Sequence, residues 1–480
     1  MKVALIQPNL DEHGNQKQAY GSIERPPETG LAVLGSWANE YAEQSHETKI
    51  FDPNRNIDDI AQEASQYDIL GVTDWFSNHK KGVNLAKAVK SLNPQTKIVF
   101  GGPNASMIPQ LILNNHPYVD YVVQRDGEES LVGLIDDRNP KTIPNLWYRS
   151  NGIPTFSFPE FTDLKMMPLW DFSRHENANE RLNEYLEAQN SGLDPWIVPP
   201  LALFSFRGCM KAIREGVCSY CTSSEEQGRA LPPEMLWQQV RHLNQTHDAE
   251  IFYMADDIFP VTAKRIKQIA EDRPDDTTAR IRAYGYLPDM AELSQSNLEE
   301  MARDLNKIGV FNLFFGSEHY DPNVLSEMNK RGIDVDETAR IIRTIYDAGG
   351  VKTTIAYLLG LPGESRETLE TNVGSLEKLM SVDGCIERLY ISIGMPLTGT
   401  PWFNDLKRDQ NIIAEYQAQT KRDLSGDDAP DYGLLSRLSL KHRSSVSPNE
   451  INEYLGRMMD IAQQKMPEYR IGGFMLNIGE

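Results

Sequence analysis

The chain is poor in cysteine, with four in 480 residues, and it has no long hydrophobic run. No stretch approaches the roughly 18 uninterrupted apolar residues of a membrane-spanning helix, which argues against a membrane protein of that class. The first residues, Met1 to Ile6, form a buried-strand pattern without the architecture of a signal peptide. Scarce cysteine and the lack of an export signal argue against a disulfide framework. We therefore expect a cytoplasmic protein with no membrane partner.

The chain also has fewer basic than acidic residues. The 48 Lys and Arg residues face 69 Asp and Glu residues, which gives a formal net charge of −21. Such a charge repels the phosphates of nucleic acids, so a polynucleotide substrate is disfavoured. The length is sufficient for two or three domains, each with its own core. Composition therefore favours a multidomain globular protein that acts on a small molecule.

Three of the four cysteines lie within thirteen residues, as Cys209, Cys218 and Cys221. Three thiolates on one loop can hold an iron–sulfur cluster and leave one iron without a protein ligand, where a small molecule can bind. The alternative is a structural zinc loop, which normally needs four protein ligands. Cys385 lies far downstream, so a zinc site would need His or Asp from elsewhere. The spacing alone leaves both possibilities open.

Residues 1–138 alternate between strand and helix patterns, which predicts an α/β domain with a Rossmann-like parallel sheet. Turn residues follow the predicted strands, among them Gly101-Gly102-Pro103-Asn104 after the fourth. Ligands of such sheets bind at the carboxyl ends of the strands. The predicted strands are 3–7, 49–51, 69–73, 97–100 and 118–123.

Residues 139–199 lose this periodicity, and we interpret them as a connector with a short helix over 176–188. The alternation resumes over 200–400, where six strands and five helices predict a partial (β/α)6 barrel. The cysteine loop follows the first of these strands, on the face where barrel enzymes carry out chemistry. Residues 401–480 are predicted to form a small helical C-terminal cap. The predicted barrel strands are 201–206, 250–254, 280–286, 310–315, 352–358 and 388–393.

Six short motifs follow one another at intervals that suit successive barrel strands. They are Phe204-Ser205-Phe206-Arg207-Gly208-Cys209; Arg229 with Pro233-Glu234-Met235; Asp256-Asp257-Ile258-Phe259; Gly316-Ser317-Glu318; Gly360-Leu361-Pro362-Gly363-Glu364; and Pro396 with Gly399-Thr400-Pro401. In this order they resemble the motifs of the cobalamin (B12)-dependent radical S-adenosylmethionine (SAM) enzymes, of the class B methyltransferase-like kind. The resemblance covers roughly residues 1–400 and implies a cobalamin-binding domain, a radical SAM barrel, and three cofactors: a 4Fe–4S cluster, SAM and cobalamin.

The resemblance also implies which residues hold the cluster and SAM. Cys209, Cys218 and Cys221 would be the metal ligands, although the first gap is eight residues where the family usually has three. A carboxylate such as Glu318 suits the ribose hydroxyls because it accepts two hydrogen bonds. Asp256 and Asp257 are adjacent on a strand, so at most one faces the site, and the resemblance favours Asp257. The remaining predicted SAM contacts are Tyr220, Ser317, Gly360 and Gly363.

For cobalamin, the expected contacts lie at the carboxyl end of the first sheet. The loop with Asp11, His13 and Gln16 differs from the corrinoid Asp-x-His-x-x-Gly motif, since Gln16 stands where glycine belongs. We interpret His13 as a surface residue. The predicted cobalamin contacts are Thr73, Asp74, Gly101, Gly102, Pro103, Asn104 and Glu128.

The function implied is a cobalamin-dependent radical SAM methyltransferase that acts on an unactivated carbon or phosphinate centre of a small molecule. The alternative is a radical SAM rearrangement, cyclisation or other group transfer without methylation, and a third possibility is a zinc-stabilised binding protein. Residues 1–138 contain no cysteine and Cys385 stands alone, so a second cluster of the kind that methylthiotransferases carry is excluded. The expected partner is an electron donor such as flavodoxin or ferredoxin. The pattern assigns no catalytic acid or base.

Overall fold

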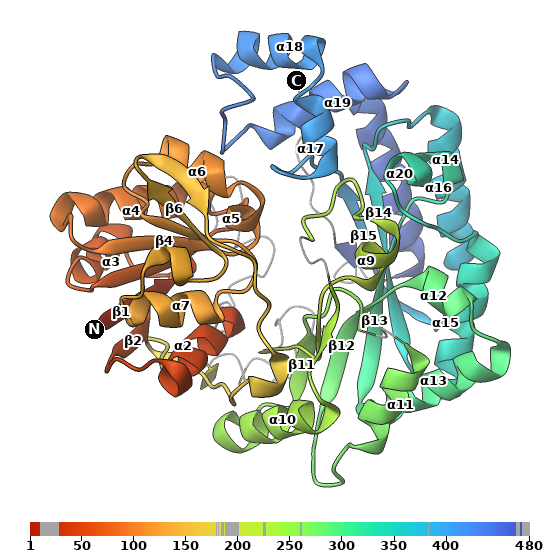
Figure 1. The fold of residues 1–480 in the computed structure, drawn as a ribbon. Helices are drawn as coiled ribbons and strands as arrows, with labels where there is room; N and C mark the ends of the chain where they lie inside the picture. The colour runs from red at the N-terminus through yellow and green to blue at the C-terminus, as the bar shows by residue number, and fades with distance from the viewer. Residues whose placement is uncertain are drawn as a thin grey trace. The chain divides into compact units, whose positions relative to one another are not determined.

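The computed structural model describes residues 1–9, 28–178, 180, 182–183, 187, 201–223, 227–259, 262–382, 384–466 and 471–472 (Figure 1). These residues form two compact units. The first contains Met1–Leu203 and Gln238–Ile251, and the second contains Phe204–Trp237 and Phe252–Glu480. The loop with Asp11 and His13 lies outside the described residues, as do residues 179, 181, 184–186 and 188 of the helix predicted over 176–188.

The first unit is built on a seven-stranded sheet with the order β2-β1-β3-β4-β5-β6-β7. Strands β1 to β5 are parallel, which confirms the predicted Rossmann-like sheet. The strands are β1 (Lys2–Ile6), β2 (Glu47–Ile50), β3 (Ile69–Thr73), β4 (Lys97–Gly101), β5 (Tyr121–Val123), β6 (Leu146–Ser150) and β7 (Ile153–Phe156).

Strands β6 and β7 were not expected, because they lie in the stretch interpreted as a connector. They form an antiparallel hairpin that extends the sheet beyond β5. Asn151 and Gly152 at its tip both have positive φ, 52° and 79°. An Asn-Gly pair with positive φ at both positions is a strong hairpin signal, since this turn matches the twist of the strands. The sequence therefore contained a signal for this hairpin. The scattered prolines and tryptophans around it interrupt the strand pattern, which is why the stretch was interpreted as a connector.

Helices cover both faces of the first sheet, and the alternation of the strands explains why. Ala4 and Ile6 of β1 pack with α3, α4 and α6, whereas Val3 and Leu5 pack with α2 and α7. Successive strand residues point to opposite faces, so each strand feeds two separate cores. The helices are α2 (Thr29–Tyr41), α3 (Ile57–Ala64), α4 (His79–Leu92), α5 (Pro103–Met107), α6 (Pro109–Asn115) and α7 (Glu128–Ile135), with 3-10 turns η1 (Pro140–Thr142) and η2 (Leu164–Met166).

The second sheet has the order β16-β15-β14-β13-β12-β11-β8, and the pairs from β12 to β16 are parallel. The six predicted strands are present. A seventh, β16, joins the edge beside β15, a strand the sequence analysis did not predict. The strands are β8 (Leu201–Leu203), β11 (Ile251–Met254), β12 (Arg280–Gly285), β13 (Val310–Glu318), β14 (Lys352–Leu359), β15 (Ile386–Ile393) and β16 (Ile471–Gly472).

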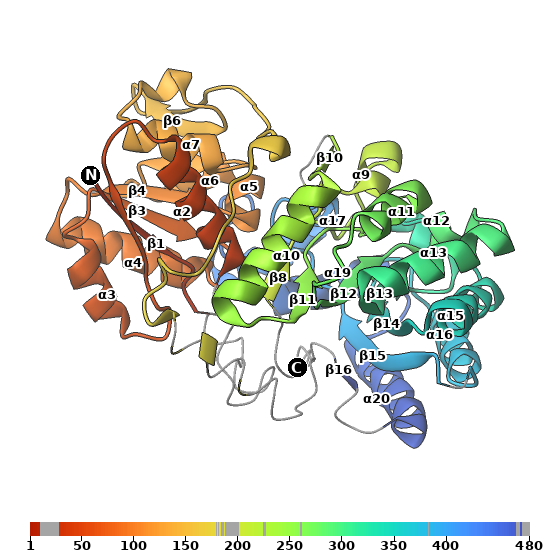
Figure 2. The same ribbon diagram turned by 90° about the horizontal axis from the view of Figure 1, so that it is seen from below.

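Helices connect these strands and lie outside the sheet, as Figure 2 shows for α11, α13, α15 and α16. This α/β arrangement agrees with the predicted barrel type. Amphipathic helices of this kind bury one stripe against the strands. The helices are α9 (Met210–Glu215), α10 (Pro233–His247), α11 (Ala263–Glu271), α12 (Leu287–Ala291), α13 (Gln295–Ile308), α14 (Pro322–Glu327), α15 (Val335–Gly349) and α16 (Arg366–Leu379).

The C-terminal region is helical: α17 (Pro401–Leu406), α18 (Gln410–Thr420), α19 (Tyr432–Arg443) and α20 (Pro448–Lys465). Trp402, Tyr416 and Leu435 share one apolar cluster that joins α17, α18 and α19. Helix α20 begins at a capping box formed by Ser447 and Glu450, which satisfies two backbone donors at its start. Among the described residues, no helix has both the length and the apolar content needed to cross a bilayer.

Candidate metal and cofactor site

The three clustered cysteines lie on one loop at the start of the second unit. Cys209 follows β9 (Phe206–Arg207), which pairs with β10 (Arg229–Ala230), and it caps α9. Cys221 donates its backbone N–H to the carbonyl of Cys218 at 2.9 Å. Ser219 between them bonds to the backbone of Met328 and of Trp402, at 2.8 Å each. The loop is therefore fixed by α14 and α17.

The thiols of the loop are partly buried and close enough to affect one another. Burial, together with the charges of Cys218, Asp257 and Cys209, raises the pKa of Cys221 to about 11. Burial also raises the pKa of Cys209, with added contributions from Asp257 and Cys218. Thiols whose charges repel one another in a buried pocket are suited to a cation, because a metal stabilises the thiolate form.

The spacing of the three sulfurs bears on which metal they suit. Among the described residues, the one group whose ligand atoms all lie within 4.8 Å of one another does not include these cysteines. A single zinc ion holds sulfurs at about 2.3 Å and therefore draws them close together. A cubane cluster binds each thiolate to a separate iron and spreads its ligands more widely. The spacing of the three sulfurs alone therefore assigns no metal.

Glu318 ends β13 beside this loop and is paired with a lysine that the sequence analysis missed. Lys330 Nζ donates to Glu318 Oε1 at 3.2 Å and lies 5.9 Å from the centre of the Tyr220 ring. Burial lowers the pKa of Lys330, but the charges of Glu318, Cys218 and Cys221 outweigh that effect and raise it overall. Lys330 therefore stays an ammonium. No motif marked it, since its importance comes from a contact across the fold.

The Tyr220 ring lies between the cysteines and Glu318. Its hydroxyl is buried and forms no hydrogen bond of ordinary geometry with the described residues. Burial and the charges of Glu318, Cys218 and Cys221 raise the pKa of Tyr220 well above its usual value. Tyr220 therefore stays neutral and contributes an aromatic face to this part of the site.

The adjacent carboxylates Asp256 and Asp257 have different surroundings. Asp256 is fully buried and accepts hydrogen bonds from Ser205 N–H at 2.7 Å, Ser205 Oγ at 2.6 Å and Phe206 N–H at 3.0 Å. Burial raises the pKa of Asp256 to about 7. Asp257 lies 3.5 Å from Ser223 Oγ, and its charge raises the pKa of Cys209 and Cys221. Asp257 is thus beside the cysteines, whereas Asp256 supports the strand that leads to them.

The glycines after β14 are already engaged by the protein. Gly360 has φ 81° and donates its N–H to Glu364 Oε2 at 2.9 Å. Gly363 has φ 80° and donates its N–H to the carbonyl of Arg443 at 2.8 Å. A Cβ at Gly363 would lie 2.7 Å from the carboxylate of Glu327. Turn geometry and this close neighbour account for Gly363 without a ligand. The Ser317 hydroxyl accepts a hydrogen bond from Tyr320 at 3.2 Å.

At the first sheet, the predicted contacts lie together at the carboxyl ends of β3 and β4. Asp74 is fully buried; its carboxylate contacts His79 Nδ1 at 2.8 Å and Asn104 Nδ2 at 2.9 Å. The side chains of Asp74 and Asn104 therefore support the edge from within. At Gly102, φ is 99° and a Cβ would lie 3.1 Å from the carbonyl oxygen of Asp74, whereas a Cβ at Gly101 would meet only Val123 at 3.8 Å.

The other three predicted contacts of the first unit lie near this edge or behind it. Thr73 ends β3 and is partly exposed, and Pro103 opens α5. Glu128 begins α7 and is buried, with Thr162 Oγ1 at 3.2 Å from its Oε2. Small residues and exposed backbone at this edge suit the approach of a large flat ligand.

Comparisons with known proteins connect both units to one family. The family model described as B12 binding domain matches residues 33–135, and the Radical SAM superfamily model matches residues 203–374. The chain belongs to the cobalamin-dependent radical SAM enzymes. It has a B12 binding domain and a radical SAM domain, the two domains that the resemblance of its motifs implies.

Three similar proteins illustrate the range of this radical SAM family. An uncharacterized methyltransferase, PH0819, of Pyrococcus horikoshii is 25% identical over 83% of this chain and 82% of its own length. An anaerobic magnesium-protoporphyrin IX monomethyl ester cyclase of Cereibacter sphaeroides is 23% identical over 73% of this chain; this chain spans 55% of that cyclase. The structure of the radical SAM methyltransferase TsrM from Kitasatospora setae, with cobalamin and a 4Fe–4S cluster bound, has a TM-score of 0.64 at 16% identity, covering 85% of this chain and 78% of TsrM. At that identity the likeness shows a shared fold.

The residues of this radical SAM chain fit the cofactors of its family. Three partly buried thiols on one loop form a donor set for the cluster. Beside them, Glu318 offers a carboxylate that is paired with Lys330 at 3.2 Å. At the first sheet, a Cβ placed at Gly101 would meet only Val123, at 3.8 Å, and Gly102 has a positive φ. The backbone at this edge therefore has room for a ligand.

Proposed function

We propose that this enzyme transfers a methyl group to an unactivated carbon or phosphinate centre of a small molecule. The observation that carries the proposal is the group of three partly buried thiols beside Glu318 and Lys330, in a chain that also has a B12 binding domain. In this chemistry, SAM at the cluster supplies a 5′-deoxyadenosyl radical, and cobalamin carries the methyl group.

Each predicted residue then has a role in holding a cofactor. Cys209, Cys218 and Cys221 bind the cluster and leave its fourth iron for SAM. Glu318 accepts hydrogen bonds from the ribose hydroxyls, and Lys330 orients its carboxylate. This pair can bind a diol with no further charged partner, because Lys330 already offsets the charge of Glu318.

The other predicted contacts orient SAM and shield it. Asp257 accepts hydrogen bonds from the SAM amino group beside the cysteines. Tyr220 and Ser317 complete the wall of the pocket, and the carbonyl of Gly360 faces the adenine. Because the Gly363 N–H is already bonded to Arg443, Gly363 acts by shaping the turn. A water-excluding wall matters because a carbon radical must meet its substrate before anything else.

Cobalamin is held at the carboxyl edge of the first sheet. Thr73 and the backbone of Gly101, Gly102 and Pro103 contact the cofactor, while Asp74, Asn104 and Glu128 fix that edge from inside the unit. The loop with His13 lacks the glycine of the corrinoid motif, and we interpret His13 as a surface residue, so we propose no side-chain ligand below the cobalt.

Cyclisation or rearrangement without methylation is the second candidate. Similarity to the magnesium-protoporphyrin ester cyclase, at 23% identity over 73% of this chain, favours it. The two candidates differ in their products, since methylation adds one CH2 unit to the substrate mass and ring closure does not. In either case the substrate is a small molecule, the electron donor is external, such as flavodoxin or ferredoxin, and the protein is cytoplasmic.

The experiment is anaerobic purification and reconstitution of the full chain with iron, sulfide and hydroxocobalamin, followed by analysis of metal and cobalamin per chain. We expect about four iron atoms and one cobalamin, as for a single cubane cluster. Cys221→Ala should lose the iron, whereas Cys385→Ala, at a fully buried cysteine outside the loop, should keep it. Iron without cobalamin would refute methyl transfer, and zinc without iron would refute the radical enzyme. Screening of methyl acceptors by product mass then separates methylation from cyclisation.

A further inference from the structure

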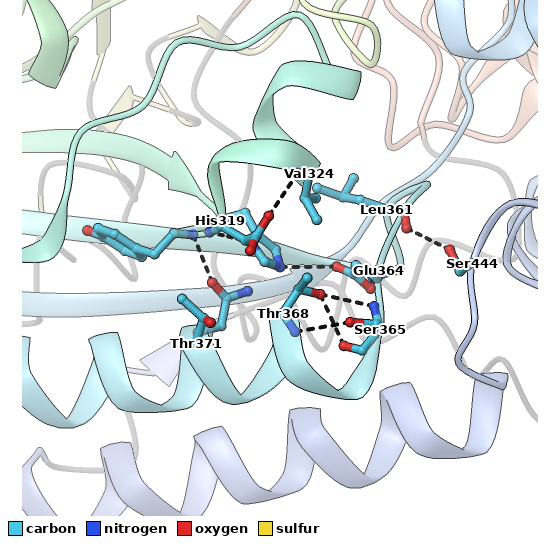
Figure 3. A network of polar contacts seen from close by, with 12 residues as sticks. His319, Val324, Leu361, Glu364, Ser365, Thr368, Thr371 and Ser444 are labelled. Carbon is cyan, nitrogen blue, oxygen red and sulfur yellow. Dashed lines mark hydrogen bonds and ion pairs between the residues drawn. The ribbon is translucent and has the colours of Figure 1, made fainter.

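A buried histidine and a buried glutamate face each other at the edge of the SAM site. His319 follows Glu318 at the end of β13, and Glu364 ends the loop after β14; they are 1% and 0% exposed. His319 Nε2 lies 3.7 Å from Glu364 Oε1, as Figure 3 shows. Neither of these two atoms has a hydrogen-bond partner among the described residues. An arrangement of this kind inside a core calls for an explanation, because unsatisfied buried polar atoms destabilise a fold.

The hydrogen bonds around the pair fix its donors and acceptors. His319 Nδ1 accepts a hydrogen bond from the backbone N–H of Asp321 at 2.9 Å, so the neutral ring carries its proton on Nε2. Glu364 Oε2 accepts from the N–H of Gly360 at 2.9 Å. Burial lowers the pKa of His319 to about 4 and raises that of Glu364 to about 8, which favours neutral forms of both. The Nε2–H of His319 is therefore on the side of Glu364 Oε1, across 3.7 Å, a separation longer than a hydrogen bond.

The backbone on the histidine side is strained. Glu318 has φ 62°, and the N–H of His319 bonds to the carbonyl of Ser317 at 2.7 Å, which makes a three-residue γ-turn centred on Glu318. The register between β13 and β14 shifts at this point. Such turns are rare for residues with a side chain and persist only where their surroundings hold them. The residue that we propose to bind the ribose is thus the strained one.

The backbone on the glutamate side is held firmly. The carbonyl of Leu361 accepts from Ser444 Oγ at 2.9 Å, and the carbonyl of Glu364 accepts from the N–H of Ser445 at 2.9 Å. Helix α16 begins directly afterwards with a capping box between Ser365 and Thr368. Figure 3 shows the contact between Leu361 and Ser444 and the capping box of Ser365 and Thr368. The backbone at Glu364 is therefore well fixed, and its side chain can restrain His319 and the strained turn at Glu318.

We propose that His319 and Glu364 are positioning residues for the SAM site, which together hold Glu318 in its left-handed conformation. This inference rests on the proposed role of Glu318 in binding the SAM ribose. Glu364 contacts Gly360 in the loop after β14 and faces His319 at the end of β13. It therefore connects these two strand ends. Two strand ends that both contribute to SAM binding are thereby kept in register by one carboxyl group.

Substitutions can separate this role from simple core packing. Glu364→Gln keeps the volume but places an NH2 group, which only donates, beside the Gly360 N–H or the His319 Nε2–H, whereas the hydroxyl oxygen of a neutral carboxyl can also accept. His319→Gln keeps a donor that reaches Glu364, whereas His319→Asn keeps only the acceptor for the Asp321 N–H. Glu367→Gln, the same change at an exposed position on α16, is the matched control.

The measurement is the SAM dissociation constant of the reconstituted full-length protein, followed by the change that SAM makes in the electron paramagnetic resonance (EPR) spectrum of the reduced cluster. We expect Glu364→Gln and His319→Asn to raise this constant about tenfold, the size of effect expected when a strained turn loses one anchor. His319→Gln should recover most of the affinity, and Glu367→Gln should match the wild type. Iron and cobalamin per chain should stay unchanged in all four.

The outcomes separate the inference from the proposed function. If Glu318→Gln weakens SAM binding but Glu364→Gln and His319→Asn do not, the positioning role is wrong and the site assignment stands. If the variants lose iron and cobalamin to the same extent as they lose SAM affinity, the pair has only a structural role, and the inference fails. If the wild-type protein shows no SAM-dependent spectral change, or Glu318→Gln has no effect, the proposed SAM site fails and the inference fails with it.

Discussion

Replacing Asp256 by alanine tests the support beneath the cysteine loop. The Asp256 side chain is fully buried and is the acceptor for three donors, the N–H and hydroxyl of Ser205 and the N–H of Phe206. These residues lead directly into β9 and Cys209. Alanine would leave all three donors buried without that acceptor, and Arg265, whose charge lowers the pKa of Asp256, would lose the nearby carboxylate.

The expected cost follows from the number of donors. A buried donor left unsatisfied costs about 1–3 kcal/mol. Three such donors, relieved in part by water entering the space, give an expected loss of about 3–6 kcal/mol in the free energy of unfolding. A typical domain is stable by about 5–15 kcal/mol, so the second unit would lose a large part of its stability.

Three further variants make the prediction specific. Asp256→Asn keeps one oxygen for both backbone N–H groups, and its amide can donate to the Ser205 hydroxyl, so we expect a loss below about 1.5 kcal/mol. Ser205→Ala removes one of the three donors and should cost about 1–2 kcal/mol. Asp275→Ala, at an exposed position, is the control and should have no effect.

The assay is urea-induced unfolding of the four variants, with iron content after reconstitution measured in parallel. Asp256→Ala should lose both stability and iron, because the strand before Cys209 is no longer held. The reasoning would be refuted if Asp256→Asn cost as much as Asp256→Ala, since the asparagine retains the hydrogen bonds. It would equally be refuted if Asp256→Ala unfolded at the same urea concentration as the Asp275→Ala control.

Two further predictions concern the site and its pH dependence. Lys330→Met removes the ammonium that pairs with Glu318 at 3.2 Å. We expect the SAM dissociation constant, measured by equilibrium dialysis, to rise about tenfold while the iron content stays unchanged. Unchanged SAM affinity would contradict the role of the pair. Burial raises the pKa of Glu364 to about 8 from 4.5, so its stabilising effect is fully present below pH 4.5 and is lost as the pH rises through 8, on the order of 5 kcal/mol in all. Glu364→Gln should therefore flatten the fall in melting temperature between pH 5 and about 9 relative to wild type, and equal slopes in the two proteins would contradict it.

Much of the fold could be predicted from local patterns. The alternation of strand and helix determined both parallel sheets, since each strand is a short apolar run and each helix has one buried stripe. The spacing of Cys218 and Cys221, with Cys209 before them, determined that three thiols would share a loop. The order of the motifs along the chain identified the family, because motifs at successive strand ends meet at one edge of a parallel sheet.

Other features depended on contacts between residues far apart in the sequence. The sequence predicted Asp256 and Asp257 on one strand, but both follow the end of β11 at Met254, and only the hydrogen bonds of Asp256 to Ser205 and Phe206 determined which carboxylate supports the loop. Strand β16 is two residues long and pairs with β15 across the whole C-terminal region, so no local pattern could reveal it. The hairpin at Asn151 and Gly152 is different, since its turn signal was present in the sequence.

The sequence by itself determined which side chains carry the chemistry: three thiols, a carboxylate at a strand end, and glycines where the chain turns. Only the tertiary structure decided how these groups are charged and held. Lys330 reaches Glu318 from twelve positions away, and Glu364 reaches His319 from 45 positions away, at distances of 3.2 and 3.7 Å. The physical reason is that charge, burial and strain are properties of an environment, and that environment exists only once distant strand ends have been brought together.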